Sequence, residues 1–72
     1  MPQFIINKNQ QDNGDYEVHN ATSGCQYMPL PQNQVDLGYH ASCHGAVLHA
    51  KRQWPNERIN GCFWCCRACH TS

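Results

Sequence analysis

Cysteine is concentrated near the end of this chain, where the last thirteen residues read NGCFWCCRACHTS. Cys62 and Cys65 are separated by two residues and follow Asn60 and Gly61. This is the spacing of a zinc knuckle, in which a tight turn points backbone amides at the first thiolate while both sulfurs reach one ion. One such pair supplies half of a tetrahedral site. The spacing therefore predicts a structural metal site that is completed by donors from elsewhere in the chain.

Donors for the second half of the site occur earlier in the sequence. His19 and Cys25 lie six positions apart across an expected turn, and Cys43 lies on the expected helix. The tail itself offers a second register of the same two-residue spacing and one more nitrogen donor, so the choice of register and the number of ions, one or two, stay open. These alternates are Cys66, Cys69 and His70.

Six cysteines in a chain of 72 residues indicate either a metal site or a disulfide framework. The N-terminal stretch MPQFIINKNQQ lacks a basic region, a long apolar run and a small-residue cleavage site, so we expect no secretory signal. We also expect no membrane span. These features predict a cytoplasmic protein, in which metal ligation is favoured over stable disulfides. An export signal preceding this sequence would reverse that preference.

Several of these residues also have a simpler structural explanation. Cys43 falls on the apolar face of the expected helix, where a buried free cysteine packs as a small hydrophobic residue. His40 and His44 are spaced i, i+4, but without the glutamate of a metalloprotease motif they are more often surface histidines. Phe63 and Trp64, inside the knuckle, are expected to cover the metal or to join the core. Base stacking by this pair is the less favoured hypothesis.

Charge and motifs narrow the classes of function. Five basic and five acidic residues cancel, without the basic surplus that is typical of nucleic-acid binders. A thioredoxin-like site needs a helix after its C-x-x-C, yet only seven residues follow Cys65. The H-x-E and P-C-x-x-C motifs of a zinc deaminase do not occur. We therefore expect a non-enzymatic module that binds a protein partner.

Two alternatives each make a structural demand. A thiol-based enzyme or metal sensor requires a spare, solvent-exposed thiolate at Cys66 or Cys69. Nucleic-acid binding requires the dispersed cations to converge on one face. Those cations are Lys51, Arg52, Arg58 and Arg67.

The elements that must position the donors can be placed along the sequence. Alternating apolar residues predict an N-terminal β-hairpin over 3–10 and 15–20, joined through Asn13 and Gly14, which both tolerate positive φ. Residues 20–36 contain two prolines and many amide side chains, and predict an ordered loop that carries Cys25.

One helix is predicted after this loop, between an N-cap at Ser42 and a stop at Pro55. A short strand around Ile59 then leads into the knuckle. The expected fold is α+β: a single domain over 1–72, in which the hairpin and the short third strand pack on one helix. The apolar residues that define the helix face recur at i, i+4, i+7 and i+11: Cys43, Val47, Ala50 and Trp54.

The order of these motifs resembles an Ada-like metal-binding plan, that of the metal-binding module of the adaptive-response DNA-repair methyltransferase. The resemblance covers about residues 16–70 and rests on YEVHNATSGC, on the alanine-containing helix in LGYHASCHGAVLHAKRQW and on INGCFWC. The chain is also similar to small uncharacterised bacterial proteins that end in ING-C-x-x-C followed by C-H-T. The resemblance implies one Zn2+ held by four ligands: His19, Cys25, Cys62 and Cys65.

Overall fold

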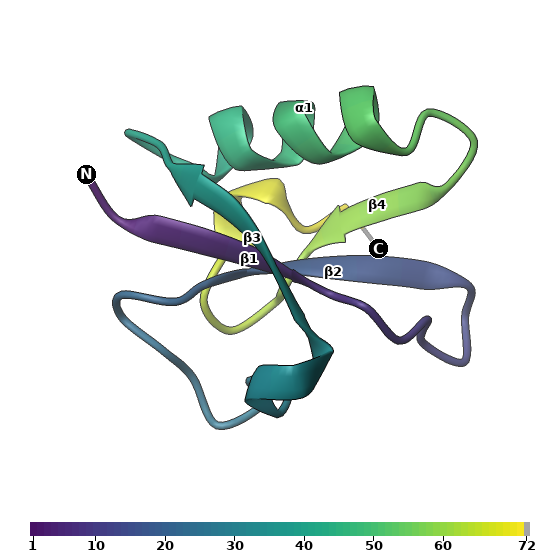
Figure 1. Ribbon diagram of the computed structural model, residues 1–72, viewed down its shortest axis with the longest axis horizontal. Coiled ribbons are helices and arrows are strands. Elements are labelled where there is room, and N and C mark those ends of the chain that lie inside the picture. The colour runs from purple at the N-terminus through teal and green to yellow at the C-terminus, as the bar shows by residue number, and fades with distance from the viewer. Residues whose placement is uncertain (72) are drawn as a thin grey trace.

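The computed structural model describes residues 1–71 and shows a four-stranded sheet with one helix packed on it (Figure 1). Two short 3-10 turns, η1 (Pro31–Asn33) and η2 (Arg67–Cys69), complete the elements. The α+β class expected from the sequence is confirmed. The strands and the helix are β1 (Gln3–Asn7), β2 (Asp15–Asn20), β3 (Gln34–Tyr39), α1 (Cys43–Gln53) and β4 (Arg58–Gly61).

The sheet has the order β3-β1-β2-β4, with β1 antiparallel to both of its neighbours and β2 parallel to β4. Parallel strands need a long crossover connection, and α1 provides it by joining β3 at one edge to β4 at the other. The parallel register places Val18 opposite Gly61. As a result, the residues that follow β2 and β4 leave the sheet at the same end.

The core lies between α1 and one face of the sheet. Phe4, Ile6, Val18 and Ala46 are buried in it, and Leu37 adds a side chain from β3. Because successive side chains of a strand point to opposite faces, Glu17 and His19 on β2 point away from this core. The sheet thus separates an apolar face under α1 from a face that carries the donor histidine.

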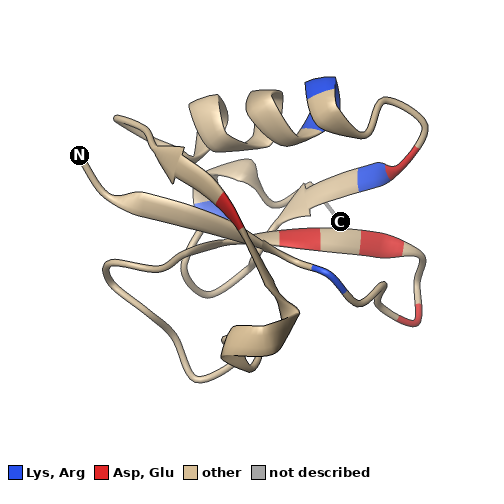
Figure 2. Cartoon of the chain, in the orientation of Figure 1, with Lys and Arg blue, Asp and Glu red and all other residues tan. Residues whose placement is uncertain are grey.

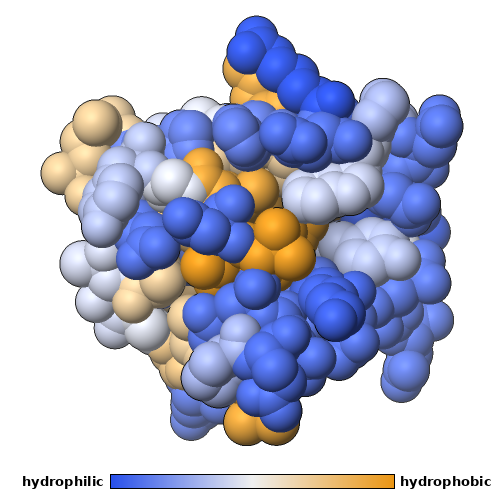
Figure 3. Space-filling view, in the orientation of Figure 1, coloured by the Kyte–Doolittle hydropathy of each residue, from blue (hydrophilic) through white to orange (hydrophobic). Residues whose placement is uncertain are grey.

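Trp54, which was expected in the core, lies at the end of α1, where it is half-buried and packs against the core. Beside it, Ile6, Tyr16, Val35 and Ile59 line a hollow of about 290 Å³. Figure 3 shows apolar side chains at the centre of this view, surrounded by polar ones. Within the part of the chain that the structure describes, no helix has the length and apolar character needed to cross a bilayer.

Strand β3 corrects the prediction of a loop over 20–36. Strand β3 contains Asp36 and Gly38, residue types that disfavour strands, and the strand with which it pairs, β1, is distant in the sequence. Gly38 has a φ of 81°, and the β1–β3 register shifts beside it, between Phe4 and Ile5. Asp36 bridges the irregularity by accepting hydrogen bonds from the Gln3 amide at 3.0 Å and the Gly38 N–H at 2.9 Å. Non-local pairing therefore overrides a composition typical of a loop.

The hairpin is present, but the loop that connects its two strands is longer than predicted. Strand β1 ends at Asn7, and residues 8–14 form the turn. Gly14 has a φ of 94°, whereas Asn13 has no positive φ. Helix α1 begins after Ser42 as expected, although the Ser42 hydroxyl makes no capping hydrogen bond.

Leu37 tests whether β3 contributes to stability. Its side chain is 3% exposed, so we expect Leu37→Ala to lower the free energy of unfolding by about 2–5 kcal/mol. Leu48→Ala is the matched control, because Leu48 is 51% exposed and should change stability by less than about 0.5 kcal/mol. Urea unfolding with metal present measures both. Equal losses in the two variants would contradict a core position for β3.

Candidate metal centre

Three segments of the chain bring four metal-binding side chains together. His19 lies on β2, Cys25 lies in the loop that follows it, and Cys62 and Cys65 lie in the turn after β4. One donor atom from each residue lies within 4.8 Å of the other three. We call these residues the knuckle group. They could hold a metal ion, and they are the four residues that the sequence analysis selected.

The contacts within the knuckle group have the spacing of a tetrahedral zinc site. His19 Nδ1 lies 3.5 Å from Cys65 Sγ and 3.8 Å from Cys25 Sγ, and the sulfurs of Cys25 and Cys62 are 3.9 Å apart. Bonds of about 2.3 Å to sulfur and about 2.0 Å to nitrogen place tetrahedral donors about 3.5 Å apart for N and S and about 3.8 Å apart for two sulfurs. The donor set therefore fits such an ion.

Two members of the knuckle group are buried, since His19 and Cys62 are each 1% exposed, whereas Cys25 and Cys65 are half-buried. Burial lowers the pKa of His19 and raises the pKa of Cys25, and it raises the pKa of Cys62 to about 12. A hydrogen bond with Cys66 and burial both raise the pKa of Cys65. Burial favours the neutral thiols, whereas a divalent cation favours the thiolates that bind it.

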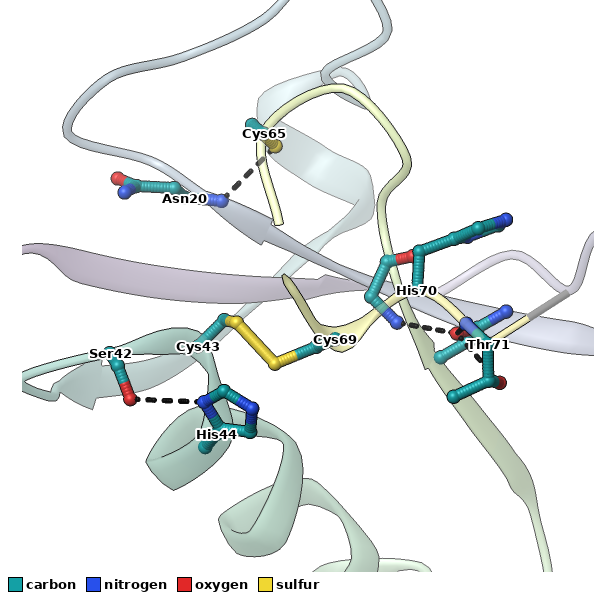
Figure 4. Close-up of a disulfide and its surroundings, with 10 residues drawn as sticks. Asn20, Ser42, Cys43, His44, Cys65, Cys69, His70 and Thr71 are labelled. Carbon is teal, nitrogen blue, oxygen red and sulfur yellow. Dashed lines mark hydrogen bonds between the residues drawn. A yellow bond between two sulfur atoms is a disulfide. The ribbon is translucent and has the colours of Figure 1, made fainter. Parts of the chain in front are cut away.

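Backbone amides point at the sulfurs, as the knuckle motif predicts. The Trp64 N–H donates to Cys62 Sγ at 3.4 Å. The Asn20 N–H donates to Cys65 Sγ at 3.3 Å (Figure 4). The turn is closed by the Cys66 N–H, which donates to the Cys62 carbonyl at 2.8 Å. N–H donors of this kind stabilise negative charge on sulfur, so the turn is built for thiolates.

Gly61 allows the tail to fold back on the knuckle. A Cβ at this position would lie 2.7 Å from both the Cys66 carbonyl oxygen and the Cys69 Cβ. Contacts this short do not occur between well-packed atoms, so a side chain here would push the tail away. The glycine before Cys62 is therefore a packing requirement of the site.

Glu17 is a site residue that the sequence analysis missed. Its Oε1 lies 3.7 Å from His19 Nε2, while Nδ1 of the same ring faces the sulfurs. A carboxylate beside the second ring nitrogen orients a ligating histidine and fixes its tautomer. Burial is the main cause of a raised pKa at Glu17. The signal available in the sequence was the i, i+2 spacing of Glu17 and His19, which places both on one face of a strand.

Two of the alternate ligands are joined to each other. Cys43, the first residue of α1, forms a disulfide with Cys69 in η2 (Figure 4), with their Cα atoms 6.3 Å apart. Cys43 is buried as expected, but the expectation that its thiol is free is wrong. The general preference for metal ligation over disulfides also fails for this pair. The reason is spatial: η2 packs against the start of α1, and the sequence spacing of 26 residues does not reveal it.

Cys66 and His70 lie outside the knuckle group. Cys66 is a free cysteine that is 3% exposed, and a hydrogen bond with Cys65 lowers its pKa. His70 Nδ1 lies 3.0 Å from the Gly61 carbonyl oxygen. Of the two possible registers, the sulfurs of Cys62 and Cys65 are the ones that meet His19. Neither Cys66 nor Cys69 is a spare, exposed thiolate, the condition that a thiol-based enzyme requires.

Three exposed aromatic side chains lie on the two loops that carry the cysteines. Trp64 is 59% exposed, Tyr27 53% and Phe63 38%. Of the two roles expected for Phe63 and Trp64, covering the metal or joining the core, the second is therefore wrong. Tyr27 and Trp64 stack with ring centroids 5.6 Å apart, and Phe63 meets Trp64 edge-on at 5.0 Å. The Arg67 guanidinium lies 4.9 Å from the Phe63 ring centroid. We call Tyr27, Phe63 and Trp64 the aromatic surface.

The cations named as a potential nucleic-acid surface do not converge. Figure 2 shows basic segments at the C-terminal end of α1, on β4 and, separate from these, on the C-terminal segment that passes behind β1. Arg58 also pairs with Asp15, with Nε and Oδ1 3.0 Å apart, and Arg67 is engaged with Phe63. The basic groups are therefore distributed, and two of them already have partners within the chain.

The contact between Glu17 and His19 predicts an effect on metal affinity. We expect Glu17→Gln to weaken binding about 10- to 100-fold while all four donors remain, because the imidazole loses its orienting carboxylate. Competition with a chromophoric chelator at pH 7 measures the affinity. Glu57→Gln, an exposed carboxylate on the loop before β4, serves as the control. An unchanged affinity in Glu17→Gln would show that the contact is incidental.

The function of this site has to be argued from its geometry. No family model, curated protein or solved structure matches the chain. The resemblance to the Ada-like metal-binding plan therefore stays a prediction. What the structure itself provides is a set of three cysteines and one histidine, two of them buried and two half-buried, that could hold a metal ion and lies next to an exposed aromatic surface.

Proposed function

We propose that the knuckle group holds one structural Zn2+ and that the protein is a non-enzymatic module that presents its aromatic surface to a protein partner. One observation carries the proposal: donors from three separate segments lie within 4.8 Å of one another. Thiolate and imidazole are the donors that zinc prefers, and four protein donors close the tetrahedron. A closed site of this kind supports structure, because no position is left for a substrate.

The energetic role of the ion follows from the size of the chain. A core built from about 70 residues supplies only about 3–5 kcal/mol, whereas a structural zinc contributes about 10–16 kcal/mol at neutral pH. The ion would join β2, the loop after it and the tail. It would therefore supply most of the stability and hold both ligand-bearing loops in place.

The same ion would order the aromatic surface. Tyr27 follows Cys25 by two positions, and Phe63 and Trp64 lie between Cys62 and Cys65. Fixing the cysteines fixes the backbone that carries these rings, which then meet across the two loops. Tryptophan, tyrosine and arginine are the residues most enriched at the centres of protein interfaces, and Arg67 lies beside this surface.

A protein partner is favoured over a nucleic acid by charge. The formal net charge is zero, and the basic residues are distributed over separate parts of the molecule. Nucleic-acid affinity depends on several cations that neutralise neighbouring phosphates. The aromatic surface has one neighbouring cation, Arg67, and its charge faces the Phe63 ring. The cytoplasmic location expected from the sequence is part of this proposal.

Removal of the metal tests the structural role. With the Cys43–Cys69 disulfide intact and the other four cysteines kept as free thiols, we expect one zinc per chain by native mass spectrometry and loss of most folded circular-dichroism signal after chelation. Cys62→Ser should show the same loss without a chelator, because it removes a buried ligand. Ala68→Ser is a conservative control at an exposed tail position outside the knuckle group. A folded spectrum that survives complete removal of zinc would end the proposal of a structural ion.

Trp64 tests the interaction surface. Since its side chain is mostly exposed, Trp64→Ala should keep one zinc and a folded spectrum while binding to a protein partner weakens at least tenfold. Wild type, Trp64→Ala and the exposed control Tyr39→Ala can be immobilised at equal density and exposed to lysate with and without nuclease treatment. We expect a defined protein to be retained by the wild type and the control alone. Equal retention by all three would contradict the surface, and binding that nuclease abolishes would point to nucleic acid.

A further inference from the structure

A second set of metal donors surrounds the disulfide. Cys43, His44 and Cys69 each offer one donor atom, and these atoms lie within 4.8 Å of one another. We propose that this trio is a redox-controlled metal site. As a disulfide it binds no ion. After reduction, the two sulfurs and the His44 imidazole bind a thiophilic divalent cation such as Zn2+.

The backbone places these donors together in the disulfide form. Cys43 and His44 are consecutive residues in the first turn of α1, and η2 brings Cys69 beside them. The Cα atoms of the two cysteines are 6.3 Å apart, so their sulfurs can separate to the distance of about 3.8 Å that two ligands of one zinc require. Small side-chain rotations are sufficient, and no element has to move.

This site differs from the knuckle group in its exposure. His44 is exposed and Cys69 is half-buried, whereas Cys43 is 8% exposed and is the innermost of the three donors. A reductant and an ion can therefore reach the site from solvent. Three protein donors leave the fourth position of a tetrahedron open, where water or a donor from a partner completes the coordination. The Ser42 hydroxyl, 3.5 Å from His44 Nδ1, is placed to orient the ring (Figure 4).

The chemistry is a two-electron exchange followed by ligation. A dithiol reductant gives two electrons and two protons to the Cys43–Cys69 bond, the sulfur–sulfur bond breaks, and the reductant becomes a disulfide. The protein then carries two thiols. When both sulfurs bind the cation they release these two protons, so the ion takes the place of the covalent bond.

Both forms hold the tail against the helix. Cys69 packs so closely against the chain at Gly61 that a Cβ there would lie 2.7 Å from the Cys69 Cβ. The disulfide and the metal would connect the same two segments at the same point. The redox state would therefore change what the surface of the protein binds without unfolding it.

Metal stoichiometry in the two redox states tests the proposal. Protein loaded with Zn2+ is measured by native mass spectrometry before and after reduction with a phosphine, in buffered zinc. We expect the reduced protein to carry one ion more than the oxidised protein. Because the result is a difference, it tests this trio whether or not the knuckle group binds an ion, so failure here and failure of the structural site are distinguishable.

A histidine pair on α1 provides matched variants. Reduced His44→Ala should bind the additional ion at least tenfold more weakly, whereas reduced His49→Ala should keep it. His49 lies on the same helix and belongs to neither donor group. Circular dichroism checks that both variants remain folded, as expected from the exposed position of His44. Equal stoichiometry in both redox states, with Cys43 and Cys69 shown to be free thiols, would overturn the proposal. An additional ion that His44→Ala keeps at full affinity would overturn it as well.

Discussion

The parallel pairing of β2 with β4 is the constraint on which the rest of the structure depends. It continues beyond the last paired residues, where the Cys62 N–H donates to the Val18 carbonyl at 2.9 Å. This hydrogen bond places Cys62 beside His19, although the two residues are 43 positions apart in the sequence. Antiparallel pairing would send β4 out at the opposite end of the sheet, away from His19. Helix α1 makes the parallel arrangement available, because it returns the chain across the sheet before β4 begins.

The two cysteine groups lie on either side of a short tail that has little core of its own. The knuckle group lies at the end of β2, and the disulfide lies at the start of α1. Between them, Cys66 is buried without belonging to either group, and Gly61 leaves the space that the returning tail fills. The disulfide attaches the tail to the helix, and an ion in the knuckle group would attach it to the sheet. Phe63 and Trp64 can remain exposed because the side chains of the tail that join the core are those of Cys62 and Cys66.

Some of this arrangement was readable from the sequence, because it depends on local spacing. The C-x-x-C pair, the histidine at a strand end and the helix stop at Pro55 are short-range signals. Strand β3 was missed because its partner is β1, more than 25 residues away in the sequence. It also contains Gly38 and Asp36, residue types that are depleted in strands. The bond between Cys43 and Cys69 depends on how η2 docks on α1, which no spacing encodes. Glu17 could have been predicted as a site residue, because side chains two positions apart on a strand point to the same face and Glu17 therefore lies on the face of His19.

The order of the attachment points along the chain has a mechanical consequence. With an ion in the knuckle group, residue 19 is joined to residue 65, while the disulfide joins residue 43 to residue 69. These two closed loops interlace, since each contains one end of the other. If the termini are pulled apart, tension passes from β2 through the ion to the tail, and β3, α1 and β4 lie outside the load path. The middle of the chain is then shielded from force applied at its ends, as long as the ion stays bound.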